Sequence, residues 1–296
     1  MAIAPDPTDV LRRFNRTYTQ RIGALDESFL GLGLPLASAR LVFEIGTTGT
    51  TTDTGVGALR ERLGLDSGYL SRLLRGLEDR GLVVVAADPA DRRRRQASLT
   101  RAGLALHGRL ERRSYELAQR LVAPLTERQL ARLTDALATA DLLVRAATVE
   151  LREVDPTGEP ATVSMQRYFA ELDERFAGGF DAGTPTPPDT FTVATSDGDP
   201  VACGGVQRIG ADARGGIDEI KRMWVDPSWR GAGLGARLLR HLEDVVRGRG
   251  HTVVRLDTNG VLGDAIAMYE RSGYRRIERY NDNPYAELFF EKMLDE

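Results

Sequence analysis

A glycine-rich loop in the second half of the chain has the residue types and spacing of an anion-binding site. It follows an apolar strand that ends at Val225 and opens an amphipathic helix, within the segment DEIKRMWVDPSWRGAGLGARLLRHLEDVV. Glycines let backbone N–H groups approach phosphate oxygens closely, and a helix N-terminus adds positive potential. The glycines at 231, 233 and 235 do not fit the GxGxxG dinucleotide motif, and no GK[ST] follows for a P-loop. We therefore expect the loop to bind phosphates of another kind of ligand; the alternative is a close-packed turn without a ligand.

A second candidate site lies in the first half, in LRERLGLDSGYLSRLLRGLEDRGLV. Two short helices follow each other closely, which is helix-turn-helix spacing. On the second helix, leucines at 70, 73, 74 and 77 form one face, while Ser71, Arg72 and Arg75 lie on the other. Asp66 is placed to cap this helix and Gly81 to end it. A DNA-recognition helix is one interpretation, and the amphipathic helix of any small bundle is the other.

The segment that follows favours DNA binding. LVVVAADPADRRRRQASLT reads as two strands around a tip that carries Arg92, Arg93, Arg94 and Arg95. Exposed arginines are often only a solvated surface. On a hairpin beside a recognition helix, however, they can neutralise phosphates or enter the minor groove. The pattern predicts a winged helix with a cationic wing.

The periodicity of apolar residues predicts how these motifs are positioned. The first half is mainly helical, and the second half alternates short apolar strands with helices, as in a mixed sheet. We expect a domain at residues 1–147 and another at 148–296. Helices are predicted at 8–30, 36–46, 54–64, 66–80, 101–121, 127–147, 161–177, 233–248 and 262–272. Strands of the second half are predicted at 149–154, 190–198, 200–209, 219–225, 251–258, 274–280 and 286–294.

Composition excludes several classes of protein. The first half carries a net charge of +5 and the second half −8. The single cysteine, Cys203, cannot form an internal disulfide, and the three histidines lack ligand spacing, so no metal site is expected. No apolar run is long enough to span a membrane and no signal peptide is visible, so we expect a cytoplasmic protein with no membrane partner.

The first half resembles the MarR family of regulators, over about residues 8–147. The resemblance is carried by Asp91, Arg92 and Arg93 at the wing tip and by Leu99 and Thr100, which open the next helix. It implies a mainly-α winged helix-turn-helix fold, a homodimer formed by the outermost helices, and a pseudo-palindromic operator in double-stranded DNA. The residues that the resemblance places at bases or phosphates are Ser67, Tyr69, Ser71, Arg72 and Arg75, with the wing arginines Arg92 to Arg95 in the flanking minor groove. Asp91 would orient the wing arginines or simply form a turn.

The second half resembles the GNAT acetyltransferase superfamily. The loop reads R-x-x-G-x-G, and the strand VELREVD, the helix AIAMYERSGY and the closing strands also match. The resemblance implies an α/β mixed-sheet acyl-CoA N-acyltransferase fold and acetyl-CoA as cofactor. It places the pantetheine and thioester at the backbone of Met223, Trp224 and Val225, and the pyrophosphate at Arg230, Gly231, Ala232, Gly233, Leu234, Gly235 and Ala236. Leu262 stands where many members have asparagine, and Asn259 is a possible substitute contact.

Direct acetyl transfer to an amine needs a base, oxyanion donors and an acid. An alkylammonium acceptor must lose a proton before it attacks. By the resemblance, Glu219 is the candidate base and Tyr269 the candidate acid, with a backbone N–H near Val225 as oxyanion donor. Glu219 could instead be a strand carboxylate paired with Lys221 or an arginine, and Tyr269 could be a core residue.

These motifs predict a MarR-type transcriptional regulator fused to an acetyl-CoA-dependent N-acetyltransferase. The acidic second half favours a cationic amine acceptor, either a small molecule or a basic peptide. The alternative is a transcription factor whose GNAT domain senses acetyl-CoA without turnover. A third hypothesis is that the winged helix serves only for dimerisation.

Overall fold

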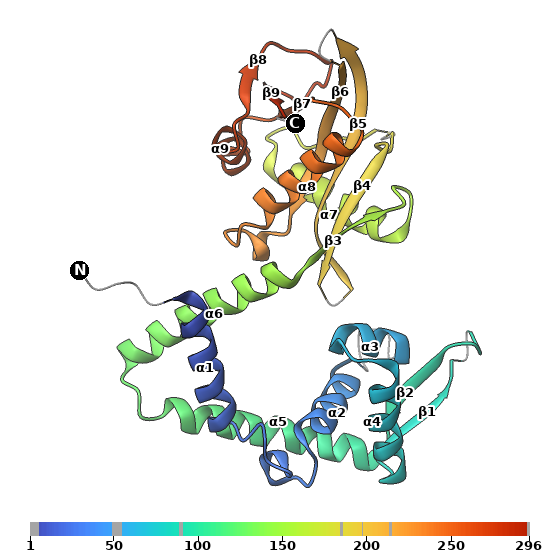
Figure 1. The fold of residues 1–296 in the computed structure, drawn as a ribbon, viewed down its shortest axis with the longest axis vertical. Helices are drawn as coiled ribbons and strands as arrows, with labels where there is room; N and C mark the ends of the chain where they lie inside the picture. The colour runs from blue at the N-terminus through green and yellow to red at the C-terminus, as the bar shows by residue number, and fades with distance from the viewer. Residues whose placement is uncertain are drawn as a thin grey trace. The chain divides into compact units, whose positions relative to one another are not determined.

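The computed structural model describes residues 6–48, 55–88, 91–183, 186–196, 198–212 and 215–294. The chain divides into two compact units, residues 1–132 and 133–296, and each is considered by itself (Figure 1). The domain boundary that the sequence analysis places between residues 147 and 148 remains a prediction.

The N-terminal unit is mainly helical, as predicted. Its elements are α1 (Pro7–Arg21), η1 (Phe29–Gly31), α2 (Leu36–Thr48), α3 (Val56–Leu63), α4 (Ser67–Asp79), β1 (Val83–Ala87), β2 (Arg95–Leu99), α5 (Arg101–Val122) and the start of α6 (Glu127–Thr148). The helix predicted over 8–30 is too long. It ends at Arg21 because the chain leaves the helix at Ile22 and Gly23 takes a left-handed φ of 66°.

The helix-turn-helix forms as its local signals predict. Gly64 ends α3 in a left-handed conformation, and Asp66 accepts a hydrogen bond from the Tyr69 N–H at 2.8 Å to cap α4. Gly81 follows α4 with a φ of 65°. Leu70, Leu74 and Leu77 are buried in the core of this unit. The opposite face of α4 therefore remains available to a ligand.

The predicted wing also forms. β1 and β2 are antiparallel, from the pair Val83 and Leu99 to the pair Ala87 and Arg95, and Gly55 bridges to Gln96 beside them. Thr100 starts α5 by accepting a hydrogen bond from the Gly103 N–H at 3.1 Å. The mainly-α winged helix-turn-helix fold is thus confirmed.

The C-terminal unit is built on a seven-stranded mixed sheet in the order β3-β4-β5-β6-β7-β9-β8. All neighbouring strands are antiparallel except β6 and β7, which are parallel. Its elements are β3 (Glu150–Val154), α7 (Glu159–Arg175), β4 (Thr190–Ser196), β5 (Asp199–Asp212), β6 (Gly215–Val225), η2 (Pro227–Trp229), α8 (Leu234–Gly248), β7 (Val253–Thr258), α9 (Gly263–Arg271), β8 (Arg275–Ile277) and β9 (Leu288–Met293). The strand predicted over 274–280 is therefore shorter, and the α/β mixed-sheet fold is confirmed.

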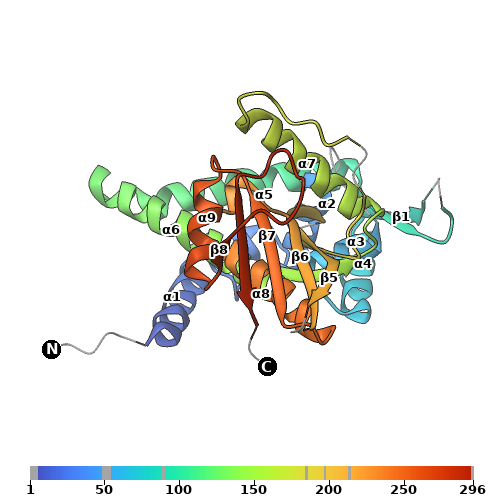
Figure 2. The same cartoon turned by 90° about the horizontal axis from the view of Figure 1, so that it is seen from above.

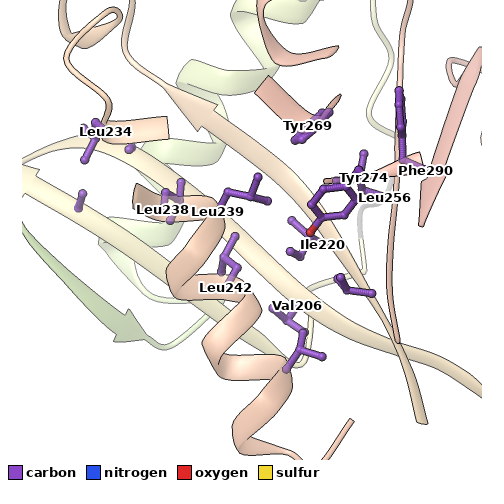
Figure 3. Close-up of a cluster of buried hydrophobic side chains, with 14 of the residues drawn as sticks. Val206, Ile220, Leu234, Leu238, Leu239, Leu242, Leu256, Tyr269, Tyr274 and Phe290 are labelled. Atoms are coloured by element: carbon purple, nitrogen blue, oxygen red, sulfur yellow. The ribbon is translucent and has the colours of Figure 1, made fainter. Parts of the chain in front are cut away.

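Helices cover both faces of this sheet (Figure 2). On one face, Leu238, Leu239 and Leu242 of α8 pack toward Val206 and Ile220 of the strands, in a core that also takes in α9 (Figure 3). On the other face, a smaller core joins α7 to β4, β5 and β6. Burial of these apolar faces stabilises the sheet and fixes which strand residues face α7.

The end of α6 packs into the C-terminal unit. Ala146 and Val149 belong to the α8-side core. Arg237 of α8 donates hydrogen bonds to the carbonyl oxygens of both, at 2.8 and 2.6 Å. Only Val149 separates α6 from β3, so this helix leads directly into the sheet. Among the described residues, no helix is both long and apolar enough to span a membrane.

Alanine in place of Gly103 is expected to destabilise the N-terminal unit. A Cβ at this position would lie 2.0 Å from the carbonyl oxygen of Leu82, so the chain at the start of β1 must shift, at a cost of about 1–3 kcal/mol. Gly108→Ala on the same helix is the matched control. Its Cβ would meet only the end of the Arg112 side chain, at 3.6 Å, and alanine favours a helix by about 0.5–1 kcal/mol.

Thermal unfolding followed by circular dichroism tests this pair. We expect a lower Tm for Gly103→Ala and an equal or higher Tm for Gly108→Ala. Equal effects of the two substitutions would contradict the close packing at Gly103.

Candidate functional site

The separation of β6 from β7 creates the candidate site. The two parallel strands pair only from Ile217 and Val253 to Glu219 and Arg255, and no further pair between them occurs among the described residues. The remainder of β6, up to Val225, therefore turns an unpaired edge toward β7. Backbone groups on such an edge need hydrogen-bonding partners. The opening between the strands can supply them to an extended ligand.

A β-bulge lies in the same part of β6. Cys203 pairs with Trp224 and Gly205 with Lys221, so Arg222 and Met223 together oppose one residue of β5. Arg222 adopts a left-handed φ of 56°, which is uncommon for a residue other than glycine. A bulge redirects side chains and often lies beside a functional site. Here it turns Arg222 and Met223 into the wall of a cavity.

The glycine-rich loop lies directly after β6. Gly231 and Gly233 have φ values of 83° and 78°, and α8 starts at Leu234 with no side-chain cap among the described residues. The first N–H groups of α8 therefore have no partner within the helix. A Cβ on Gly235 would lie 3.2 Å from the Met268 sulfur, so the loop also needs glycine for packing. This geometry suits an anion held by backbone N–H groups.

Arg230, predicted to hold pyrophosphate, is engaged by a carboxylate that the sequence analysis missed. Its guanidinium contacts both Glu171 oxygens, at 2.6 and 2.5 Å, and its Nε donates to the Val225 carbonyl at 3.0 Å. Glu171 of α7 also accepts hydrogen bonds from Trp224 and Arg175. Burial raises the pKa of Glu171, but the hydrogen bonds from Arg230 and Trp224 and the charge of Arg230 outweigh burial and hold that pKa below its usual value of 4.5.

A cavity of about 850 Å³ contains both predicted catalytic side chains. Glu219 and Tyr269 line it, together with Asp257 of β7 and Tyr168 of α7, which the sequence analysis did not single out. The walls come from α7, β6, β7, α9 and the segment between β8 and β9. The two predicted residues thus meet in one cavity although 50 positions separate them in the sequence.

Glu219 is buried within a hydrogen-bonding network. Its Oε1 accepts from the Tyr280 hydroxyl at 2.8 Å and from Asn281 Nδ2 at 3.0 Å, and its Oε2 lies 2.7 Å from Lys221 Nζ. The pairing with Lys221 that the sequence left open is therefore present. It does not remove Glu219 from the cavity, whose wall includes both side chains.

Asp257 is the second carboxylate of the cavity. Asn281 Nδ2 also donates to Asp257, at 2.6 Å, so one amide group joins Asp257 to Glu219. Asn283 donates to the other oxygen of Asp257 at 3.1 Å. Burial, with the charge of Glu219, raises the pKa of Asp257 against the opposing effect of these hydrogen bonds. Two carboxylates held this close suit a proton-accepting or ammonium-binding role.

Tyr269 and Tyr168 bring two phenol groups to the cavity. Burial raises the pKa of Tyr269 far above its usual value of 10.0, and the charge of Asp257 adds to this effect. Burial also raises the pKa of Tyr168, with a contribution from Tyr269. Both hydroxyls therefore stay protonated at neutral and moderately alkaline pH, as a proton donor requires.

Comparisons with known proteins agree with this geometry. Residues 148–274 match the sequence profile of the acetyltransferase (GNAT) family. The IAA acetyltransferase of Azospirillum brasilense is 38% identical over 136 residues, which are 44% of this chain and 86% of that protein. The N-alpha-acetyltransferase RimI of Mycobacterium tuberculosis is 32% identical over 132 residues, which are 40% of this chain and 81% of that protein. The chain belongs to the GNAT acetyltransferase family.

The first half matches a second family. Residues 32–94 match the MarR family. A solved MarR-family transcriptional regulator from Rhodococcus sp. RHA1 is 20% identical in sequence. The match spans 47% of this chain and 97% of that protein, with a TM-score of 0.38. A MarR-like winged helix-turn-helix region therefore precedes the GNAT acetyltransferase domain in this chain, as its motifs predicted. These families imply DNA binding, usually a dimer, and an acyl-CoA cosubstrate.

Of the predicted cofactor-binding residues of the GNAT domain, Met223 and Asn259 line the cavity, and the residues of the glycine loop do not. Met223 lines the cavity, whereas the Trp224 side chain packs in the core beside α7 and Val225 pairs with Ala202 of β5. Asn259 also lines the cavity, and its Nδ2 donates to the Tyr285 carbonyl at 2.8 Å. Asn259 therefore shapes the loop before α9, and its contact with a cofactor remains a prediction.

The predicted DNA-binding residues of the MarR-type domain lie on two surfaces, one on α4 and the other on the wing. Ser67, Ser71, Arg72 and Arg75 are exposed on α4, and the Arg72 guanidinium lies 5.7 Å from the ring centre of the half-buried Tyr69. The wing arginines 92–95 are exposed at the start of β2 and in the turn before it. Asp91 both shapes this turn, by accepting from the Arg93 N–H at 3.0 Å, and pairs with Arg94 at 3.7 Å. Asp91 therefore forms the turn and also contacts a wing arginine, which are the two roles that its sequence position suggested.

The lowered pKa of Glu171 predicts how the GNAT domain responds to acid. Its interactions stabilise the fold above about pH 4.5, and this contribution is lost as the pH falls through the depressed pKa of the folded protein. Glu171→Gln is therefore expected to unfold more easily at neutral pH. Its stability difference from the wild type should shrink on acidification below pH 4.5.

Both tryptophans, Trp224 and Trp229, lie in the GNAT domain, so urea unfolding followed by their fluorescence reports on this domain. Glu174→Gln on the exposed side of the same helix is the control, and we expect it to match the wild type. A stability difference for Glu171→Gln that stays constant with pH would contradict the prediction.

Proposed function

We propose that the protein is a DNA-binding regulator whose GNAT domain transfers an acetyl group from acetyl-CoA directly to an amine. The observation that carries this proposal is the convergence of Glu219, Asp257 and Tyr269 on one cavity. That cavity opens where β6 leaves β7, and β6 leads directly into the glycine loop. Acetyl-CoA would therefore bind along β6 toward the glycine loop, with proton removal and proton return in the cavity beside that strand.

The backbone of β6 and the glycine loop would bind acetyl-CoA. The unpaired edge of β6 at Met223–Val225 can form hydrogen bonds with the pantetheine amides, and the N–H groups at the start of α8 suit the pyrophosphate. Arg230 already has a carboxylate partner in Glu171. Arg230 therefore fixes the loop to α7 and adds positive charge near the phosphates, while the loop N–H groups supply the direct contacts.

Glu219 would accept the proton that the acceptor ammonium must lose. A free amine nitrogen can then attack the acetyl carbonyl, and a backbone N–H of β6 would stabilise the oxyanion. Lys221 places a positive charge beside Glu219, and the neighbouring Asp257 provides a second acidic group for the ammonium. As the carbon–sulfur bond breaks, the Tyr269 hydroxyl would donate its proton to the departing thiolate.

The N-terminal domain would bind a pseudo-palindromic operator as a homodimer. Support for a partner surface comes from α1, which has no buried residue in the single chain. Leu11, Phe14 and Tyr18 of α1 are 49–60% exposed, and exposed apolar clusters of this kind often mark interfaces. A dimer would present two α4 helices and two wings to successive turns of DNA.

One observation favours the sensing alternative. The carboxylate of Glu219 is engaged by Tyr280, Asn281 and Lys221, so proton acceptance requires one of these contacts to loosen. Calorimetry with acetyl-CoA, combined with thiol release over a panel of amines, separates the two functions. Turnover supports transfer. Tight binding without turnover on any amine, together with a change in operator affinity, supports sensing.

Tyr269→Phe is expected to lower kcat by roughly 100-fold or more, because the thiolate loses its proton donor. The affinity for acetyl-CoA measured by calorimetry should stay unchanged. Tyr274→Phe is the matched control, because this buried neighbouring tyrosine, 6.0 Å from the Tyr269 ring, does not line the cavity.

The raised pKa of Tyr269 also predicts the alkaline side of the pH profile. The hydroxyl would lose its proton only above pH 10, the usual pKa of a tyrosine. We therefore expect kcat to hold level as the pH approaches 10. An alkaline fall near that pH in the wild type that Tyr269→Phe abolishes would contradict the assignment.

Removal of the α4 arginines should abolish operator specificity. Arg72→Ala combined with Arg75→Ala is expected to weaken operator binding by about 1–3 kcal/mol for each base that an arginine no longer reads. Arg93→Ala on the wing should instead weaken binding to all sequences alike and reduce the salt dependence by about one phosphate contact. Gel shifts with the promoter of this protein and with unrelated DNA, at several salt concentrations, measure both effects. Wild-type binding without sequence preference at low salt would support a role in dimerisation alone.

A further inference from the structure

Arg222 is a cation in the cavity that the catalytic proposal does not use. It lies at the β-bulge of β6, on the strand that carries the candidate base Glu219. Its backbone is left-handed, and its half-buried side chain lines the cavity. A strained backbone conformation of this kind persists where the surrounding structure determines it, and it is frequent at ligand-binding sites.

Arg222 differs from the other two cations of the cavity in its partners. Lys221 lies 2.7 Å from Glu219, and Arg255 lies 2.8 Å from Glu291. Arg222 has no carboxylate within ion-pair distance among the described residues. Its hydrogen-bond partner is the carbonyl oxygen of Thr186, which accepts from Nη2 at 2.7 Å. Among the described residues, most of its five N–H donors therefore have no partner.

Leaving this guanidinium half-buried without a counter-charge is unfavourable. Burial lowers the pKa of Arg222, and the groups that act against this effect are Tyr168 and Cys203, which are neutral at ordinary pH. A planar guanidinium binds a carboxylate through two parallel hydrogen bonds, and such bonds are stronger when the site excludes water. A carboxylate on the bound ligand would supply the missing charge.

An aromatic wall closes another part of the same cavity. Phe180 lies 5.4 Å from Phe169 and 4.7 Å from Tyr285, measured between ring centroids, and Phe176 lies 5.9 Å from Phe180 and 5.7 Å from Tyr285. The Tyr285 hydroxyl accepts a hydrogen bond from the Asp181 N–H at 2.9 Å, which ties the segment after α7 to the segment before β9. This wall suits an aromatic or apolar group.

We propose that the acceptor is an amine that also bears a carboxylate, with Arg222 binding the carboxylate and the aromatic wall holding an apolar or aromatic body. Glu219 and Asp257 take the ammonium end, so the acceptor is a zwitterion of the amino-acid type. This inference rests on the proposed acetyl transfer and makes its substrate class specific. It replaces the purely cationic amine acceptor that the net charge of the second half favours.

Matched amines test the role of the carboxylate. L-Phenylalanine carries it, L-phenylalaninamide replaces it with a neutral group, and phenethylamine lacks it. With the wild type and acetyl-CoA, we expect kcat/KM for phenylalanine to exceed the values for the other two amines by roughly ten- to a hundredfold, the range of a hydrogen-bonded charge pair. Equal or better use of the amide and of phenethylamine would overturn the proposal.

Variants of Arg222 assign this discrimination to its side chain. Arg222→Asn removes the guanidinium but tolerates a left-handed backbone, and Arg222→Lys keeps the charge. We expect Arg222→Asn to lose the preference for phenylalanine over phenylalaninamide and phenethylamine, and Arg222→Lys to recover part of that preference. Arg152→Gln, an exposed arginine of β3, is the control. An equal loss with all three amines, together with a lower Tm, would assign Arg222 a structural role and overturn the proposal.

Calorimetry separates this inference from the proposed transfer. Phenylalanine and phenylacetate are titrated into the wild type and into Arg222→Asn, in the presence of coenzyme A. Binding that depends on Arg222 supports the carboxylate site even if no amine is acetylated, in which case the transfer proposal fails alone. Absence of carboxylate binding to the wild type, or binding that survives in Arg222→Asn, would overturn the inference.

Discussion

The early end of the pairing between β6 and β7 is the constraint on which the candidate site of the GNAT domain depends. Parallel pairing ends at Glu219, and the bulge at Arg222 and Met223 follows within the next four residues. An open strand edge inside a sheet is costly unless its backbone groups find partners. Here the edge faces a cavity, in which an extended ligand can form hydrogen bonds with these backbone groups. The proposed base, the backbone proposed to bind the thioester and the arginine proposed to face the acceptor then lie on one strand, so their spacing is fixed by the strand itself.

Glu171 links the two sides of this site. Its carboxylate receives Arg230 from the glycine loop, Trp224 from β6 and Arg175 from its own helix. Three donors on one partly buried carboxylate offset its desolvation, which explains why the pKa of Glu171 falls in spite of burial. The helix α7 forms one wall of the cavity, so the same contact positions the glycine loop and this wall with respect to each other.

The sequence predicted features that depend on local signals. The cap at Asp66, the glycine that ends α4, the wing and the glycine loop each follow from residues close together in the chain, and they were found as expected. The partners of Glu219 were not predictable in this way. Asn281 meets it across 62 positions, and Asp257 joins it only through that amide. The role of Arg222 depends on a bulge, which is a property of strand pairing and leaves no periodic signal in the sequence.

Net charge is a weak guide to the ligand of such a site. The second half carries a net charge of −8. Its cavity is nevertheless lined by three cationic side chains, Lys221, Arg222 and Arg255, as well as by Glu219 and Asp257. Exposed charges beyond about 10 Å are largely screened by salt, whereas charges in a partly buried cavity act on a bound ligand at short range. Lys221 and Arg255 are neutralised by their own carboxylates, so Arg222 dominates the cationic side. A cation apart from the paired carboxylates suits the proposed acceptor with two opposite charges, which the net charge of the domain would not indicate.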